Sequence, residues 1–99
     1  MSEGRWRRER STVLEWRDEW LPALAAAGPA SIEVDPAAEP APGTPWNWWL
    51  SFSVGDLSIE AIVAEGLDAV VFEDEHGRFE DQVAPDGVPG YLLGRSARS

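Results

Sequence analysis

The sequence contains no cysteine and no lysine, and it has one histidine among its 99 residues. Without cysteine, neither a disulfide framework nor a thiolate metal site can form. No run of about 18 apolar residues occurs, so the sequence predicts no membrane-spanning helix. The charged N-terminus lacks the apolar segment of a secretory signal. From these absences we expect a cytoplasmic protein without a membrane attachment.

Sequence patterns of catalysis are also missing. The single histidine, His76, falls between Glu75 and Gly77 in a predicted turn, which offers neither the pocket nor the orienting partner that a general base needs. The chain has no G-x-S-x-G, P-loop, G-x-G-x-x-G or H-E-x-x-H motif, and the acids near His76 do not follow the spacing of an EF-hand loop. The sequence therefore predicts a protein that is not an enzyme, with no catalytic residues, no cofactor and no metal site.

Negative charge dominates the chain, and it is unevenly placed. The formal net charge is −10. Residues 1–17 carry five arginines and three acids, whereas residues 18–94 carry fifteen acids and Arg78 as their one base. Such a body repels phosphate, so nucleic acid is not an expected partner. Cations in a first helical turn oppose the helix macrodipole, so the N-terminal arm should either fray or be held by the acidic body.

The clearest structural pattern is a β-hairpin over residues 46–63. Apolar side chains occupy every second position from Trp46 to Val54 and again from Leu57 to Val63, on either side of the two-residue turn Gly55-Asp56. A one-residue shift would send every apolar side chain to the wrong face, so the register is well specified. The predicted pairs are Val54 with Leu57, Phe52 with Ile59, Leu50 with Ala61, and Trp49 with Ile62.

Two further turns extend the hairpin into a meander over residues 46–83. Glu65-Gly66 and residues 74–77 are turn sequences that flank a third and a fourth strand. If both turns are tight, one row across four strands holds Phe52, Ile59, Phe72 and Phe79. The corresponding predicted pairs are Val70 with Ala61, Phe72 with Ile59, Phe79 with Phe72, and Arg78 with Glu73.

Residues 5–27 form the predicted helix. A helical period of 3.6 residues gathers an apolar face, which Gly28-Pro29 ends. Pro22 should either kink the helix or end it near Trp20. Arg17 falls on the apolar side, where it either reaches the rim or pairs with a buried acid. The apolar face consists of Trp6, Val13, Leu14, Trp16, Trp20, Leu21 and Leu24.

The remaining segments complete one small domain over residues 1–99. Ile32 and Val34 mark a short strand whose place in the sheet is open, residues 35–45 form a proline-rich loop, and residues 94–99 should be a frayed tail. Packing the helix on the apolar face of the meander predicts a two-layer α+β fold, with an N-terminal helix on an antiparallel sheet of four to five strands.

One tryptophan and a group of acids are the candidate binding residues. Trp49 is out of phase with the apolar alternation and is either a simple cross-strand pair or an aromatic anchor for a partner. The acids at the turns and strand ends of the meander serve either solubility or electrostatic attraction of a basic protein. The candidate partner-binding residues are Trp49, Glu73, Asp74, Glu75, Glu80 and Asp81.

The helix sequence VLEWRDEW and the meander sequence GDLSIEAIVAEGLDAVVFEDEHGRF resemble, in style, the small acidic immunity proteins of bacterial polymorphic toxin systems. The resemblance implies a non-catalytic α+β protein that inhibits a basic toxin by surface binding, and it assigns no individual binding residue. Two alternatives stay open. One is a homo-oligomeric structural domain, such as a homodimer formed through a sheet edge or Trp49, and the other is a small-ligand carrier with a tryptophan-lined pocket.

Overall fold

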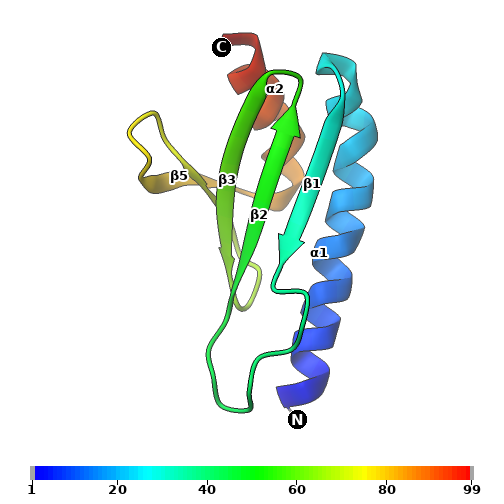
Figure 1. Cartoon of the computed structure of the whole chain (residues 1–99), viewed down its shortest axis with the longest axis vertical. Helices are drawn as coiled ribbons and strands as arrows, with labels where there is room; N and C mark the ends of the chain where they lie inside the picture. The colour runs from blue at the N-terminus through cyan, green and yellow to red at the C-terminus, as the bar shows by residue number, and fades with distance from the viewer. Residues whose placement is uncertain (1, 99) are drawn as a thin grey trace.

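The computed structural model describes residues 2–98, which form a five-stranded antiparallel sheet with two helices (Figure 1). The strands lie in the order β1-β2-β3-β4-β5, with α1 beside β1 and α2 behind β2 and β3 (Figure 1). The predicted α+β class is confirmed, and the short strand at residues 32–34 joins the sheet. The elements are α1 (Ser2–Leu24), the 3-10 turn η1 (Ala25–Ala27), β1 (Ala30–Asp35), β2 (Asn47–Val54), β3 (Leu57–Ala64), β4 (Val70–Glu73), β5 (Phe79–Val83), the 3-10 turn η2 (Pro85–Gly87) and α2 (Val88–Arg98).

Helix α1 buries the predicted apolar stripe against the sheet. Trp6, Val13 and Trp20, which are seven residues apart, are all buried. The helix continues through Pro22 to Leu24 and then tightens into η1, so it does not end near Trp20. Pro22 lacks the N–H that would bond the carbonyl of Asp18, so the helix gives up this hydrogen bond and continues for only two more residues.

Both open questions about the charged residues of α1 have answers in the structure. Arg17 bonds the neighbouring Asp18 at 3.1 Å and keeps a side-chain exposure of 36%, so it lies at the rim and not against a buried acid. The N-terminal arm is helical and is tied to the acidic body through ion pairs of Arg5 with Glu65 and of Arg7 with Glu39.

The β2–β3 hairpin has the predicted register. Val54 pairs with Leu57, Leu50 with Ala61, and the intervening positions follow in phase. Gly55 has a φ of 58°, a conformation that a two-residue turn of this kind requires and that glycine adopts without strain. The alternate residues Trp48, Leu50, Phe52 and Val54 are buried, which confirms that one face of this hairpin lines the core.

The predicted register of β3 with β4 is wrong by two residues. Ala61 pairs with Phe72 and Ile62 with Val71, so Val70 does not lie opposite Ala61, and Phe72 does not lie opposite Ile59. The reason is the connection, because β3 ends at Ala64 and β4 begins only at Val70. The predicted tight turn at Glu65-Gly66 does form, with a hydrogen bond from the Leu67 N–H to the Ala64 carbonyl at 3.1 Å, but residues 67–69 stay unpaired after it, and the pairing therefore shifts.

A β-bulge also overturns the predicted pairing of β4 with β5. Phe72 pairs with Asp81 and Glu73 with Phe79, so β5 advances by two residues where β4 advances by one. The extra residue, Glu80, reverses the facing of the strand between Phe79 and Asp81. Phe79 therefore does not lie opposite Phe72 and does not join the predicted row with Phe52 and Ile59. Arg78 does not lie opposite Glu73, because Phe79 takes that position.

The C-terminal segment is a helix where we expected a frayed tail. Residues 94–98 belong to α2, while Ser99 lies outside the described residues. Val88 and Leu92 are fully buried, and the Tyr91 ring lies 4.6 Å from the Phe72 ring. Arg95 donates to the Tyr91 hydroxyl and to the Glu73 carbonyl. These contacts hold α2 on the same face of the sheet as α1.

Candidate functional site

The sheet has one face that neither helix covers, which we call the open face. Side chains on it alternate with the buried ones, and cross-strand partners lie on the same face. The register gives five such rows or pairs: Asn47 with Ala64; Asp35 with Trp49, Ile62, Val71 and Gln82; Glu33 with Ser51 and Glu60; Ser31 with Ser53 and Ser58; and Glu73 with Phe79.

An aromatic pair occupies the open face. Trp49 retains 41% of its surface and is the one large hydrophobic residue in the described part of the chain that is classed as exposed. Its ring meets that of Phe79 edge-to-face, with centroids 5.7 Å apart and an interplanar angle of 85°. Trp49 thus lies opposite Ile62, as predicted, and also against a phenylalanine that the bulge brought to this side of the sheet.

Four carboxylates surround this aromatic pair. Asp35 is the strand partner of Trp49, and Glu73 is the strand partner of Phe79. Glu33 and Glu60 lie in the next row, on either side of Ser51. No arginine occupies an open-face position of the five strands. The open face therefore combines exposed aromatic surface with charge of a single sign.

Glu73 is the one predicted acid that the structure brings together with Trp49. Glu73 lies one residue beyond the last pair of β3 with β4, which is Ala61 with Phe72. Its Oε1 accepts a hydrogen bond from the backbone N–H of Glu60 at 3.2 Å and so continues the contact between the two strands. Glu75 and Glu80 are exposed, on the β4–β5 turn and at the bulge, and neither pairs with any side chain that the structure describes.

Two other predicted acids, Asp74 and Asp81, accept hydrogen bonds within the protein and are therefore not free to bind a partner. Asp74 accepts hydrogen bonds from the backbone N–H groups of His76 at 2.8 Å and Arg78 at 3.0 Å, and so holds the turn. The bond from Arg78 has the largest effect and lowers the pKa of the Asp74 carboxyl. Desolvation opposes it, but the bond from His76 adds to the lowering, and the pKa stays below its usual value.

Asp81 lies on the helix side of the sheet. It accepts a hydrogen bond from the Tyr91 hydroxyl at 2.7 Å and lies 3.8 Å from Arg95. Burial and the hydrogen bond to Asp81 raise the pKa of Tyr91 above its usual value, although Arg95 opposes them. The bulge at Glu80 separates Asp81 from Phe79 and hence from the open face.

The most deeply placed acid, Glu9, is 8% exposed and is not among the site residues predicted from the sequence. Its Oε1 accepts from the indole N–H groups of Trp46 at 2.9 Å and Trp48 at 3.1 Å, and its Oε2 accepts from the backbone N–H of Gly66 at 2.9 Å. Arg5 completes the set with an N–O distance of 3.4 Å. One carboxylate therefore ties α1 to β2 and to the β3–β4 loop.

The surroundings of Glu9 decide its protonation. Burial raises the pKa of the carboxyl, but the hydrogen bonds from the two indoles and the Gly66 amide, together with the charge of Arg5, outweigh burial and leave the pKa below its usual value. A sequence signal for this role exists, because Glu9 lies three residues after Trp6 and four before Val13, on the apolar stripe.

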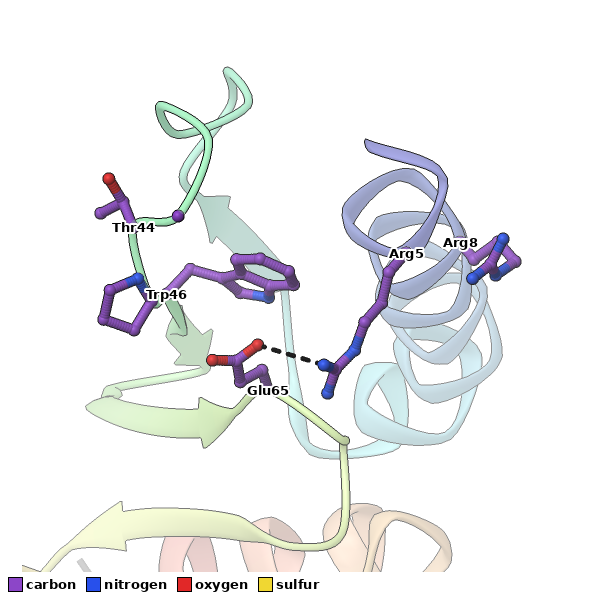
Figure 2. Close-up of a pocket in the computed structure, with 7 residues that line it drawn as sticks. Arg5, Arg8, Thr44, Trp46 and Glu65 are labelled. Carbon is purple, nitrogen blue, oxygen red and sulfur yellow. Dashed lines mark ion pairs between the residues drawn. The ribbon is translucent and has the colours of Figure 1, made fainter. Parts of the chain in front are cut away.

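A separate cavity of about 460 Å³ lies between the start of α1 and the proline-rich loop (Figure 2). Arg5 crosses it to reach Glu65 at 3.5 Å, and its guanidinium lies 5.7 Å from the centre of the Trp46 ring. The hydroxyl of Thr44 and the guanidinium of Arg8 point away from Trp46 (Figure 2). The polar groups of this cavity therefore do not converge on one ligand position, and two of its charged groups, Arg5 and Glu65, already pair with each other.

Within residues 2–98, no three His, Cys, Asp or Glu side chains are arranged to hold a metal ion. In the same part of the chain, no helix has both the length and the apolar character needed to cross a membrane. No protein-family model matches this chain, and neither a curated protein nor a solved structure shows significant similarity to it.

Proposed function

We propose that this protein is a non-catalytic binding domain whose open face docks onto a basic protein. The observation that carries the proposal is the exposed Trp49, packed on Phe79 and surrounded by four carboxylates without a base among them. Tryptophan is enriched among the residues that dominate binding energy. Complementary charge steers a partner onto such a surface and disfavours partners of the same sign.

The specific form that we propose is an immunity or inhibitor protein that neutralises a basic toxin in the cytoplasm. A toxin that acts on nucleic acid must carry positive charge where it grips phosphate, and an acidic protein can cover that surface. The resemblance of the helix and meander sequences to small acidic immunity proteins supports this form. It requires no catalytic group on the inhibitor.

Two alternative occupants of the chain's surfaces receive less support. A second copy of the chain would bring four further carboxylates against Glu33, Asp35, Glu60 and Glu73, and like charges across an interface repel. A small ligand would need converging polar groups in a concave site. The cavity beside Trp46 does not provide them.

Photocrosslinking in lysate of cells that naturally make the protein, at low and at high salt, tests the proposal. The photoreactive amino acid p-benzoylphenylalanine would replace Ser51, between Glu33 and Glu60 on the open face, and, as a matched control, the exposed Ala23 on α1. We expect one basic protein to be crosslinked from position 51 and not from position 23, with a yield that falls as salt rises. Crosslinks from position 23 alone, to an acidic protein, or to nothing would overturn the proposal.

A further inference from the structure

We infer that the Trp49–Phe79 pair and its two strand-partner carboxylates form a site for one cationic side chain, an arginine or lysine of the partner. The inference deepens the proposed function and rests on it, because it identifies what the open face recognises. The group that binds would be a guanidinium or an alkylammonium, seated against the aromatic rings.

In an edge-to-face pair the edge of one ring covers part of a face of the other, and the ring faces that stay uncovered are open to a cation. The interplanar angle of 85°, with centroids 5.7 Å apart, sets the face of one ring nearly perpendicular to the face of the other. Each face carries the negative part of the ring quadrupole, and a cation within about 6 Å of a ring centroid is attracted to it. Tryptophan gives the strongest such attraction, and Trp49 is the more exposed of the two residues.

Each ring also has a carboxylate beside it. Asp35 is the strand partner of Trp49, and Glu73 is the strand partner of Phe79. Directly paired residues have Cβ atoms about 4.5–5.5 Å apart, so each acidic side chain starts beside the aromatic residue that it would assist. One oxygen of Glu73 accepts from the backbone N–H of Glu60, and its other oxygen would face the cation. A guanidinium can stack on an aromatic ring and bond a carboxylate in its plane at the same time.

The molecule already contains this arrangement twice, with the cation supplied from within. Arg5 lies over the Trp46 ring at 5.7 Å and bonds Glu65, and Arg95 lies over the Tyr91 ring at 5.7 Å beside Asp81. In both places an aromatic ring, a carboxylate and an arginine occur together. At Trp49 the ring and the carboxylate are present, but none of the arginine side chains that the structure describes lies over either ring. The partner would supply the missing cation.

A peptide titration followed by NMR tests the inference. The probe is the tripeptide acetyl-Arg-Arg-Arg-amide at low salt, and its neutral counterpart contains citrulline, which keeps the shape of arginine and lacks its charge. We expect the indole N–H signal of Trp49 to shift saturably with the arginine peptide and at least tenfold more weakly with the citrulline peptide. Equal shifts with both peptides, or no saturable shift of this signal, would overturn the inference.

Variants separate the cation site from general acidity. Trp49→Leu keeps apolar surface and removes the aromatic ring, while Asp35→Asn and Glu73→Gln each remove one carboxylate charge. We follow these variants through the backbone N–H signals of Ile62 and Val71, the row neighbours of position 49, which Trp49→Leu retains. We expect each variant to weaken binding of the arginine peptide at least threefold, whereas the matched control Glu19→Gln, on the exposed side of α1, leaves binding unchanged. A control loss equal to that of Asp35→Asn would show attraction by net charge alone and overturn the inference.

The two proposals can fail separately. Crosslinking from position 51 that persists together with full arginine-peptide binding by Trp49→Leu would keep the open face as the docking surface and overturn the cation site. A specific, Trp49-dependent peptide response without any crosslinked protein would do the reverse. Dispersed NMR spectra of each variant would show that the fold is intact, so a lost response could be assigned to the site.

Discussion

The two faces of this sheet use the same materials, tryptophan and carboxylate, in opposite ways. On the covered face, the Glu9 carboxylate accepts hydrogen bonds from Trp46 and Trp48 and from a backbone amide, beside Arg5. On the open face, Asp35 lies beside Trp49 but accepts no hydrogen bond from any residue that the structure describes. The carboxylate of Glu9 has its hydrogen-bond donors within the protein, whereas the carboxylate of Asp35 can still accept hydrogen bonds from a partner.

Both faces contain a carboxylate beside tryptophan, so the residue types alone do not separate a structural site from a binding site. The two sites differ in whether the carboxylate finds its hydrogen-bond donors within the protein. A buried carboxylate is tolerated only when donors compensate for its lost hydration, and Glu9 has such donors. An exposed carboxylate needs no internal donor, because water serves until a partner replaces it. The comparison leads to predictions in which the covered face controls stability and the open face controls binding.

The largest expected effect is the loss of the carboxylate on the covered face. Glu9→Ala leaves the buried Trp48 indole N–H and two partly buried donors without their acceptor, so we expect the free energy of unfolding to fall by about 3 kcal/mol. Urea denaturation would measure it. Glu15→Ala, at an exposed position of the same helix, should change stability by less than about 0.5 kcal/mol. Equal effects of the two variants would contradict the structural role of Glu9.

Acid should selectively weaken the contribution of Glu9. Because its pKa is lowered in the folded state, the unfolded state binds more protons, and the stabilisation present above the unfolded pKa of about 4.3 is lost as the pH falls toward the folded pKa. We expect Glu9→Gln to be less stable than the natural protein by about 1–3 kcal/mol at pH 7, with the gap narrowing toward pH 3. A gap that is constant or widens on acidification would contradict the assigned direction of the shift.

A smaller effect on stability is expected at Tyr91, whose hydroxyl bonds both Asp81 and Arg95 within the protein. Tyr91→Phe removes the hydroxyl that donates to Asp81 and accepts from Arg95, while the ring contact with Phe72 remains. We expect a loss of about 1 kcal/mol in the free energy of unfolding, measured by urea denaturation. Arginine-peptide binding at Trp49 should not change, and a loss of that binding would break the separation between the two faces.

The smallest effect on stability is expected on the open face itself. Trp49→Leu removes an edge-to-face contact of an exposed ring, so unfolding should become easier by about 1 kcal/mol or less, whereas Trp48→Leu, in the core, should cost more than about 2 kcal/mol. Thermal unfolding of the two variants would measure the contrast. Comparable losses would mean that Trp49 is a structural residue and that the open face is not specialised for binding.

The sequence predicted those parts of the fold that depend on neighbouring residues alone. Alternation with a period of two and a tight turn at Gly55 fixed the β2–β3 register, and the 3.6-residue period identified the buried face of α1. It failed at the five-residue loop before Val70 and at the bulge beside Phe79. Neither leaves a mark in the alternation, because a loop length and a bulge are set by the packing of the strands and helices around them.

Only part of the candidate site could be predicted from the sequence. Trp49 stood out because it broke the alternation, and Glu73 was among the predicted acids. Asp35 was missed because β1 could not be paired with β2 from its sequence, and Phe79 because the bulge reverses its side. Glu9 was grouped with the neighbouring arginines by charge, although its helical position placed it among the apolar residues.

The most direct test compares the two faces in one NMR titration with acetyl-Arg-Arg-Arg-amide. The indole N–H signals of Trp49 and Trp48 report the open and the covered face of the same molecule. The account predicts a saturable shift of the Trp49 signal, while the Trp48 signal, bonded to Glu9 in the core, stays in place. A shift confined to Trp48, equal shifts of both signals, or no saturable shift of Trp49 would contradict the assignment of binding to the open face.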